Sequence, residues 1–439
     1  MNVLMFGWEF PPHISGGLGT ACYGLTKALS GQGTNILLVI PKVHGDEENN
    51  SIRLLGANQI GYSHEEKYEE QEEVKKLKKE LTYIPIDSPI SPYMTEQIYD
   101  ELWFSEENSE ILNTEIKKTV SGKKFEFSGK YGANLMEEVR RYAQVAKKIA
   151  LENDFDIIHA HDWLTFQAGI EAKKISNKPL IIHVHATEFD RSGEHINPEV
   201  FRIEKLGMEM ADRIIAVSEF TKNILINRYE IPADKIIAIH NGVDFGKETD
   251  IKQNSNRLRG KKIVTFLGRI TYQKGPTYFV DAAYRILQKN KEVVFVMAGN
   301  GDLLPGMIEK VAALGISSNF FFTGFLKGKE VSKRLGMSDV YVMPSVSEPF
   351  GISPLEAMKS GVPVIISRQS GVSEVVEHAL KVDFWDVEAL ADAIFGLLNY
   401  NTLSHEFSNQ GRTEVDKLNW EKAAEKTRCE YEILLNQNL

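Results

Sequence analysis

Short apolar runs alternate along the chain with longer stretches in which apolar residues recur every three or four positions. Such runs, bounded by glycine and polar residues, are typical of strands buried on both faces of a parallel sheet. The longer stretches have the period of amphipathic helices, as in residues 132–150, where Leu135, Val139, Tyr142 and Ile149 share one face. Alternating strands and helices predict an α/β fold built from doubly wound sheets. The predicted strands are residues 3–6, 36–40, 155–160, 180–185, 214–218, 236–240, 261–268, 293–298, 320–324, 340–343, 362–366 and 371–374.

Residues 45–130 interrupt this pattern. An acid- and lysine-rich run at residues 65–80 is followed there by Pro85, Pro89 and Pro92, which break regular structure. We interpret the segment as an insertion in a first domain that shapes the site for the larger substrate.

Residues 246–260 are polar and lack apolar periodicity, which predicts a linker. A strand, a loop and a helix begin anew directly after it. A chain of 439 residues is also too long for one core, since cores usually divide beyond ~250–300 residues. We therefore predict two Rossmann-like domains with a cleft between them and a C-terminal helix that returns to the first. The predicted boundaries are residues 1–245 for the first domain, 246–419 for the second and 420–439 for the returning helix.

The composition argues against several classes of protein. Because the net charge is −10, nucleic acid is not an expected partner. The two cysteines, Cys22 and Cys429, are far apart and lack metal-ligand spacing. The N-terminus has no signal-peptide pattern, and no apolar run approaches the ~18 residues that span a bilayer. We expect a cytoplasmic protein with no integral membrane segment, and nothing in the composition indicates an oligomeric state.

The run at residues 340–343 is followed by a turn and by the start of a helix. Ser353 suits the N-cap of this helix, and Pro354 suits its first helical position. Glu356, three residues after Ser353, could complete a capping box. The N–H groups of the turn then face the carboxyl edge of a sheet, where α/β folds bind anions and nucleotides. These groups belong to Gly351, Ile352 and Ser353.

Two carboxylates, Glu348 and Glu356, flank this turn. Each has a purely local alternative. Glu356 could do no more than complete the capping box, and Glu348, which precedes Pro349, could be a solvated loop acid. The stretch alone therefore indicates a binding site without establishing one.

A second loop carries two cations. Arg269 and Lys274 follow the predicted strand at residues 261–268, and a helix begins at Pro276. At the carboxyl end of the first strand of a domain, two such cations can grip a diphosphate. Solvated surface cations are the alternative, and the position of the loop favours the phosphate interpretation.

The first domain opens in a similar way, since Gly16, Gly17 and Gly19 follow the strand at residues 3–6. Glycines there let the backbone approach a ligand closely, although they could also serve only a tight turn. Their spacing differs from the G-x-G-x-x-G of dinucleotide-binding proteins, which disfavours a nicotinamide cofactor.

Polar residues end two further strands of this domain. Asp162 follows the strand at residues 155–160, and His183 and His185 lie in the strand at residues 180–185. The ends of strands line the crevice of an open α/β sheet. We expect one of the two histidines to face the core, which leaves His185, nearer the strand end, as the better site candidate.

With these residues assembled, the chain resembles the retaining glycosyltransferases of the two-domain GT-B architecture, in particular family 4 and the related glycogen and starch synthases. Glu348 and Glu356 match their E-x7-E motif, and the loop at residues 268–275 and the paired glycines support the resemblance independently. It spans nearly the whole chain. The sequence His-Ala-His-Asp-Trp at residues 159–163 is most similar to glycogen synthases.

The resemblance implies roles for residues of the second domain. Arg269 and Lys274 would hold the donor diphosphate, assisted by the N–H groups of the turn. Glu356 would bind the ribose hydroxyls, and Glu348 would bind hydroxyls of the donor sugar.

The resemblance also implies roles in the first domain. Gly17 would approach the phosphates, His185 would contact the sugar, and Asp162 would lie near the reacting centre or the acceptor. The cleft would close between the domains, so that neither domain holds a complete site.

The implied activity is retaining transfer of a hexose, with glucose expected, from ADP- or UDP-glucose to an acceptor glycan. No cofactor is implied, because the nucleoside diphosphate sugar is a substrate. Starch-type synthases carry a lysine before the paired glycines, where this chain has Ile14. This difference leaves open a donor or an acceptor other than those of the starch-type synthases. Extension of an α-glucan is therefore favoured only slightly over another acceptor, such as a cell-surface glycan or a small sugar. A phosphorylase of the same architecture and a non-catalytic binding protein are the further alternatives.

Asp154 and Asp156 spell the D-x-D pattern by which another glycosyltransferase architecture holds a divalent cation. The pair lies at the amino end of its strand, whereas ligands bind beyond the carboxyl ends. Arg269, Lys274 and the helix start already supply positive potential at the diphosphate. We therefore expect no metal there.

Overall fold

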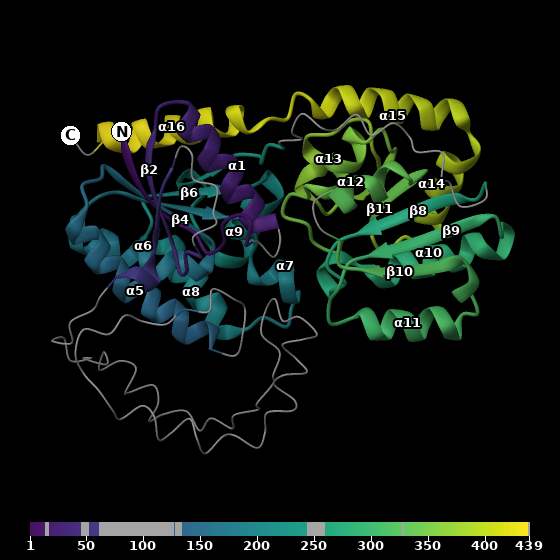
Figure 1. Cartoon of the computed structure of the whole chain (residues 1–439), viewed down its shortest axis with the longest axis horizontal. Helices are drawn as coiled ribbons and strands as arrows, with labels where there is room; N and C mark the ends of the chain where they lie inside the picture. Colours follow the sequence, from purple (N-terminus) through teal and green to yellow (C-terminus); the bar gives the residue numbers. More distant parts are fainter. Residues whose placement is uncertain are drawn as a thin grey trace, which may run out of the picture.

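The computed structural model describes residues 1–13, 17–44, 52–60, 127, 134–243, 260–326 and 329–437. Two α/β domains lie side by side, and each is a parallel sheet with helices on both faces (Figure 1). The predicted junction at residue 245 lies outside the described residues, and so does most of the segment interpreted as an insertion.

The first sheet has seven parallel strands in the order β3-β2-β1-β4-β5-β6-β7. Each strand predicted for this half of the chain is present. The sequence missed β3, an edge strand within the segment interpreted as an insertion, because its residues are only partly buried and form no long apolar run. The bounds are β1 Asn2–Phe6, β2 Asn35–Ile40, β3 Arg53–Gly56, β4 Ile157–His161, β5 Leu180–Val184, β6 Arg213–Ala216 and β7 Ile236–Ala238.

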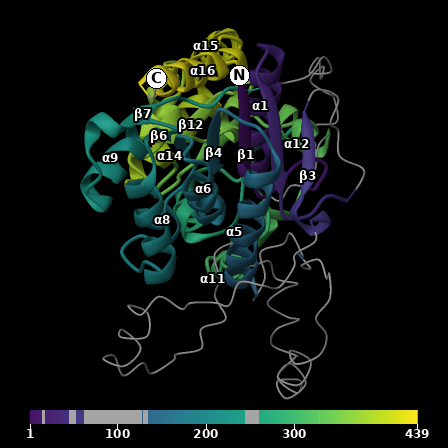
Figure 2. The ribbon, with the colours of Figure 1, turned by 90° about the vertical axis from the view of Figure 1, so that its left-hand side faces the viewer.

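Alternate residues of each strand point to opposite faces, and two groups of helices cover them. Ile157 belongs to the core beneath α1 and α16, whereas Ile158 belongs to the core beneath α5, α6 and α8. Figure 2 shows these two groups on opposite sides of the strands. The bounds are α1 Gly17–Gly31, α5 Leu135–Glu152, α6 Trp163–Ser176, α7 Glu188–Ser192, α8 Pro198–Met210, α9 Glu219–Tyr229 and α16 Trp420–Gln437, with the short 3-10 helices η1 Ala57–Gln59 and η3 Ala233–Lys235.

The second sheet has six parallel strands in the order β10-β9-β8-β11-β12-β13. The prediction that residues 371–374 finish this sheet was wrong, because they form a 3-10 helix and the last strand is a three-residue, partly buried edge strand at 380–382. Helices α10, α11 and α14 cover one face, and α12, α13 and α15 cover the other. The strands are β8 Lys262–Leu267, β9 Val293–Ala298, β10 Phe320–Gly324, β11 Val340–Met343, β12 Val364–Ser367 and β13 Leu380–Val382. The helices are α10 Pro276–Lys289, α11 Leu304–Ala313, α12 Lys329–Gly336, α13 Ser353–Lys359, α14 Val387–Asn399 and α15 Asn401–Val415, with η4 Tyr272–Lys274, η5 Ser317–Asn319 and η6 Gly371–Glu374.

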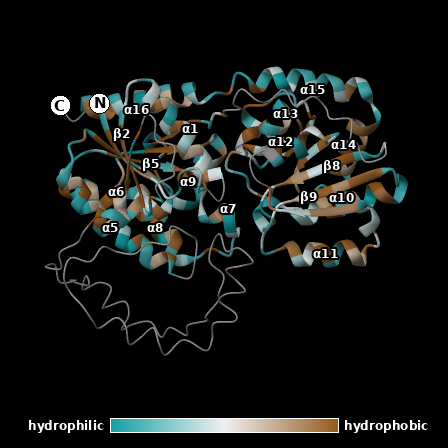
Figure 3. Ribbon diagram, viewed as in Figure 1, coloured by the Kyte–Doolittle hydropathy of each residue, from teal (hydrophilic) through white to brown (hydrophobic). Residues whose placement is uncertain are grey.

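The apolar residues gather where the two sheets meet their helices. Figure 3 shows hydrophobic strands in the interior of each domain and hydrophilic residues on the outer sides of the helices. Among the described residues, no helix combines the length and the apolar character needed to cross a membrane.

In each sheet, the direction of winding reverses between two neighbouring strands. These strands are β1 and β4 in the first sheet, and β8 and β11 in the second. The loops after them diverge, which creates the crevice at the carboxyl edge where α/β proteins bind ligands. Gly17 and Asp162 follow the first pair, and Arg269, Lys274 and Glu348 follow the second.

The C-terminal helix returns to the first domain, as predicted. Helix α16 lies along α1, and Trp420, Ala424 and Tyr431 enter the core that the two helices cover. Gly24 of α1 is needed for this contact, because a Cβ atom there would lie 2.3 Å from the Trp420 ring. Both ends of the described chain consequently lie on the same side of the first domain (Figure 1).

Gly24→Ala should lower the free energy of unfolding by about 1–3 kcal/mol, because overpacking of a filled core forces side chains and backbone to shift. Urea unfolding followed by tryptophan fluorescence measures this change. Gly31→Ala is the matched control, since Gly31 lies in the same helix with open space around its Cβ position. Equal stability of the two variants would contradict close packing of α16 on α1.

Candidate active site

Two loops at the carboxyl edge of the second sheet are held together by their backbones. Gly275 ends the loop after β8 in a left-handed conformation with φ of 63°, and a Cβ atom there would lie 2.0 Å from the Pro344 carbonyl oxygen. The Val346 N–H donates to the Gln273 carbonyl oxygen at 2.9 Å. The loop after β8 and the loop after β11 therefore form one unit, in which glycine is required at position 275.

This unit brings two predicted site residues into direct contact. The Lys274 ammonium and the Glu348 carboxylate form an ion pair, with 2.5 Å between Nζ and Oε2. The Ser345 hydroxyl donates to the same carboxylate oxygen at 3.2 Å. The side chain of Glu348 is 7% exposed and that of Lys274 is 19% exposed, so the pair lies in a largely desolvated place where each charge needs the other.

The backbone around Glu348 is also fixed. Its N–H donates to the Gln369 carbonyl oxygen at 3.0 Å, and its carbonyl oxygen accepts from the Gly371 N–H at 2.9 Å. Gly351 then turns the chain with φ of 100°, and a Cβ atom there would lie 3.2 Å from Cγ of Glu348. The turn thus passes close beneath the carboxylate without covering it with a side chain.

The capping box predicted at the start of α13 does not form. The Leu355 and Glu356 N–H groups donate to the Ile352 carbonyl oxygen, at 3.0 and 3.1 Å, so Ile352 is the N-cap and Ser353 is the first helical residue. The Ser353 hydroxyl instead accepts from the Tyr341 hydroxyl at 2.8 Å. The prediction was wrong because the helix begins one residue earlier than the pattern of capping residues indicates.

Glu356 therefore has no capping role. Its side chain is partly buried, and burial raises the pKa of its carboxyl to about 7. None of the described residues donates a hydrogen bond to this carboxylate. A group that is costly to ionise and is not needed by its own helix is a candidate for binding a ligand.

Arg269 is placed by close approaches between backbones. A Cβ atom at Gly299 would lie 1.8 Å from the Gly268 carbonyl oxygen, and the Ile270 N–H donates to the Asn300 carbonyl oxygen at 2.9 Å. Burial raises the pKa of the nearby Asp302, and the charge of Arg269 acts in the opposite direction. The guanidinium is thus held on a rigid loop at the same edge of the sheet as Lys274.

In the first domain, Asp162 connects the ends of β4 and β5. It is buried and adopts φ of 59°, which is uncommon for a residue with a side chain. Its Oδ1 accepts from the His185 N–H at 2.7 Å and from the Ala186 N–H at 3.3 Å. Burial raises the pKa of Asp162 to about 6, against the opposing effect of the positive charge of Arg191.

Four histidines form an array on β4 and β5. His159 and His161 stack at 4.3 Å between ring centroids, and so do His183 and His185, while Nδ1 of His161 lies 2.9 Å from Nε2 of His185. His183 is buried and His185 is only partly buried, which agrees with our expectation that one of them faces the core, although residues two apart on a strand share a face. Burial lowers the pKa of His185 to about 3, so its ring is neutral near pH 7.

Ring nitrogens of His159, His161 and His183 lie close enough to share a metal ion. The ring planes of His159 and His161 are inclined by 13°, and those of His159 and His183 by 14°. A metal ion lies near the plane of each imidazole that binds it, and planes of stacked, nearly parallel rings do not converge on one point. The array is therefore better explained as stacked neutral rings than as a metal centre.

Gly17 is the first residue of α1. It is exposed, and no atom lies within 4 Å of where its Cβ would be, while Gly16 falls outside the described residues. Open space at the start of a helix after β1 is compatible with the approach of a ligand. The structure gives no contact between Gly17 and the other predicted site residues.

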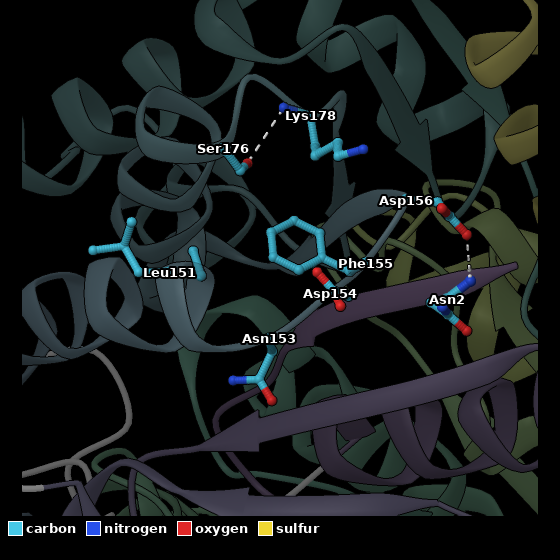
Figure 4. Close-up of a pocket in the computed structure, with 9 residues that line it drawn as sticks. Asn2, Leu151, Asn153, Asp154, Phe155, Asp156, Ser176 and Lys178 are labelled. Atoms are coloured by element: carbon cyan, nitrogen blue, oxygen red, sulfur yellow. Dashed lines mark hydrogen bonds between the residues drawn. The ribbon is translucent and has the colours of Figure 1, made fainter.

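The D-x-D residues lie away from this site. A hollow of about 430 Å³ at the amino edge of the first sheet is lined by Asp154, Asp156 and Lys178, among others (Figure 4). The Asp156 carboxylate accepts from the Asn2 N–H at 2.7 Å, which ties the start of β4 to the start of β1. Asp156 thus acts at the entry of its strand, as its position in the sequence predicts.

Sequence reasoning missed the residues that join the two domains beside Glu348. The Ser347 hydroxyl donates to the Asp190 carboxylate, and the Ser218 hydroxyl donates to the Pro349 carbonyl oxygen at 2.6 Å. Asp190 and Ser218 belong to the first domain, whereas Ser347 and Pro349 belong to the second. No local pattern indicates such contacts, because they depend on how the domains meet.

These features define a two-domain α/β protein of the GT-B architecture. Two family models match consecutive parts of the chain, Glycosyltransferase Family 4 at residues 116–247 and Glycosyl transferases group 1 at residues 247–414. The chain belongs to the GT-B glycosyltransferases of family 4.

Curated relatives match the chain from end to end. One relative is a protein of Methanocaldococcus jannaschii that is described as an uncharacterized glycosyltransferase. It is 27% identical over 452 residues, and the match covers 99% of each chain. The glycogen synthase of Mycobacterium tuberculosis is 22% identical over 450 residues, which are 98% of this chain and 94% of that one. Identity at this level supports the family more firmly than any substrate.

Solved structures share the fold over the full length. Sucrose-phosphate synthase from Thermosynechococcus elongatus has a TM-score of 0.72 at 19% identity, with 99% of each chain covered. An Anabaena protein in complex with UDP and glucose has a TM-score of 0.64 at 16% identity, covering 98% of this chain and 99% of that one. The catalytic domain of starch synthase IV from Arabidopsis thaliana, bound to ADP and acarbose, has a TM-score of 0.65 at 16% identity, with 99% of each covered.

Lys274→Ala should lower the free energy of unfolding by about 2 kcal/mol or more, because removing one partner leaves a buried carboxylate without its counter-ion. Adding Glu348→Gln to this variant should restore most of the loss, and urea unfolding measures both changes. Lys289→Ala, at an exposed lysine of α10, is the control. Equal stability of the single and double variants would show that the ion pair does not hold the loops.

Proposed function

We propose that the protein is a retaining hexosyltransferase that moves glucose from ADP- or UDP-glucose to an α-glucan acceptor. The observation that carries the proposal is the buried pair of Lys274 and Glu348 at the switch point of the second sheet. A cation and a carboxylate in one desolvated place suit a ligand that has a diphosphate beside sugar hydroxyls. The family and its nucleotide-bound structural neighbours support a nucleotide-sugar donor and a glycan acceptor.

In this proposal, the second domain binds the donor. Arg269 and Lys274 neutralise the diphosphate, whose charge grows as the bond to the sugar breaks. The N–H groups of Gly351, Ile352 and Ser353 assist them. Glu356 binds the ribose hydroxyls, and Glu348 binds hydroxyls of the glucose and fixes its orientation.

The first domain contributes neutral and acidic groups. His185 is uncharged near pH 7, so its ring offers one hydrogen-bond donor or acceptor to the sugar without repelling cations nearby. Asp162 fixes the His185 backbone and lies next to it, near the acceptor. Gly17 approaches the phosphates from the start of α1.

The configuration at C1 of glucose is retained because the acceptor oxygen attacks C1 from the same face that the diphosphate leaves. The acceptor oxygen forms a bond to C1 of glucose as the bond from C1 to the phosphate oxygen breaks. The hydroxyl proton passes to the leaving phosphate oxygen, so the products are an α-glucoside and a nucleoside diphosphate. No side chain of the chain is required as a covalent nucleophile.

Support for an α-glucan acceptor comes from the full-length similarity to a glycogen synthase. The isoleucine at position 14, where starch-type synthases have lysine, favours a different acceptor, and this residue lies outside the described part of the structure. Transfer to another glycan or a small sugar is therefore the alternative.

Release of the nucleoside diphosphate from a panel of sugar donors, with and without glycogen or maltooligosaccharides, tests the proposal. We expect glucan-stimulated release from ADP- or UDP-glucose and an α-linked product by proton NMR. Stimulation by another acceptor alone would replace the glucan. Sugar release driven by inorganic phosphate, without a nucleotide donor, would indicate a phosphorylase instead.

Arg269→Ala should raise the donor KM and lower kcat/KM at least about tenfold, since a charge-assisted contact contributes ~1.5–3 kcal/mol. Steady-state kinetics with saturating acceptor measure this. The control is Arg285→Ala. Arg285 is an exposed arginine of α10 that forms an ion pair with Glu388 of α14. Unchanged donor kinetics in Arg269→Ala would remove Arg269 from the diphosphate site.

Donor affinity should weaken as the pH falls below about 7, because the Glu356 carboxyl, whose pKa burial raises to about 7, then gains a proton. Glu356→Gln should bind donor more weakly at high pH and lose this pH dependence. Its melting temperature should stay close to that of the wild type, because Glu356 caps no helix. A pH profile shared by both proteins would assign the titration to another group.

Sugar transfer should persist in a brief excess of EDTA, because Arg269, Lys274 and backbone N–H groups already stabilise the diphosphate. Asp154→Asn should leave activity nearly unchanged, since Asp154 is an exposed residue at the amino edge of the first sheet. Assays with and without magnesium or manganese measure this. Loss of activity in EDTA with recovery on adding either ion would show that the diphosphate is held by a metal.

A further inference from the structure

The two domains meet around Glu348. The residues on either side of it, Ser347 and Pro349, both bond to the first domain. The carboxylate of Glu348 itself bonds within the second domain, to Lys274 and Ser345. A residue whose neighbours are held by one domain and whose side chain is held by the other has a position that depends on both.

The contact before Glu348 is made by a rigid acceptor. Asp190 lies in α7 and is fully buried. One of its oxygens accepts from Ser347, while the other accepts from the Thr187 N–H at 2.7 Å and the Thr187 hydroxyl at 2.8 Å. Because α7 follows His185 directly in the chain, the same short segment positions the proposed sugar-binding histidine and holds Ser347.

The contact after Glu348 is made at the start of α9. The Ser218 hydroxyl donates to the Pro349 carbonyl oxygen at 2.6 Å and also accepts from the Thr221 N–H at 3.0 Å as the N-cap of α9. Ser218 and Thr221 are fully buried. Proline restricts its own backbone, so a bond to its carbonyl fixes the direction in which the chain leaves Glu348.

Glycine at position 371 makes this approach possible. A Cβ atom there would lie 2.2 Å from the Pro349 carbonyl oxygen and 2.5 Å from Cβ of Ser218. Three residues later, the Glu374 carboxylate accepts from the N–H groups of Glu219 and Phe220, at 2.9 and 2.6 Å. The first turn of α9 therefore grips the second domain at two places.

We propose that Asp190 and Ser218 are positioning residues that hold the Glu348 carboxylate in its reactive place from across the domain interface. The inference rests on the proposed function, in which Glu348 orients the donor sugar. In the proposed function, all the side chains that bind the nucleotide belong to the second domain, but correct placement of the sugar needs both domains in contact. Misplacement by about 1 Å lowers turnover on the order of 10²-fold.

Two variants of the second domain test this without altering a proposed donor ligand. Ser347→Ala removes the bond to Asp190 and leaves the cap of α7 intact. Gly371→Ala inserts a methyl group between Pro349 and Ser218. In both, kcat should fall at least about tenfold, while the Kd of the nucleoside diphosphate should change less than about threefold, because the displaced group contacts the sugar.

Matched controls separate positioning from general damage. Ser373→Ala removes a hydroxyl of η6 that, among the described residues, bonds to the Arg368 and Ser370 carbonyl oxygens of its own domain, and Gly306→Ala adds a methyl group where no neighbouring atom lies within 4 Å. Both should keep wild-type kcat. Hydrogen exchange at residues 345–352 should accelerate in Ser347→Ala and Gly371→Ala, with the melting temperature of Ser347→Ala close to that of the wild type.

The outcomes are distinct. Wild-type kcat in an active, folded Ser347→Ala protein would overturn the role of Asp190, and wild-type kcat in Gly371→Ala would overturn that of Ser218. Should Gly371→Ala not fold, Ser218→Ala takes its place, with the same division between kcat and nucleotide Kd expected. Absence of sugar transfer in the wild type would instead refute the proposed function, and the exchange measurement would still report whether the first domain orders the loop.

Discussion

The structure of the site depends on the ion pair between Lys274 and Glu348. The two opposite charges lie in a largely desolvated place and pair with each other, which joins the loop after β8 to the loop after β11. Backbone contacts from Gln273 and Gly275 reinforce the union. A diphosphate that approached Lys274 would compete with Glu348 for the same ammonium, which couples the arrival of the donor to the freedom of the carboxylate beside it.

The two domains carry different kinds of side chain at the carboxyl edges of their sheets. The second supplies cations and acids on loops that glycines bring close to neighbouring backbone. The first supplies buried Asp162 and a stack of neutral histidines, whose charged forms burial disfavours. Arg269 and Lys274 thus belong to the second sheet, whereas the histidine rings of the first are neutral near pH 7. This division follows from the strand order, since each switch point presents only the loops of its own domain.

The sequence predicted the fold well, because buried parallel strands and amphipathic helices have distinct periods. It placed Lys274 and Glu348 on loops at the carboxyl ends of strands, but the ion pair between them became visible only in the structure, where β8 and β11 are neighbours. It missed β3 and β13, which are short, partly buried edge strands, and it placed the start of α13 one residue late. The contacts of Ser347 with Asp190 and of Ser218 with Pro349 were out of reach, because no periodicity encodes which surfaces of two domains meet. The roles of the site residues toward a donor stay predictions.

The return of α16 to the first domain affects how the protein is made. Trp420, Ala424 and Tyr431 complete a core whose other members come from α1 and from strands near the N-terminus. During synthesis, domains generally fold as units and N-terminal ones first. Here the first domain to leave the ribosome lacks one wall of its core until the last helix has emerged, whereas the second domain has all its strands by residue 382. The half of the enzyme that is translated first is therefore the half that finishes folding last.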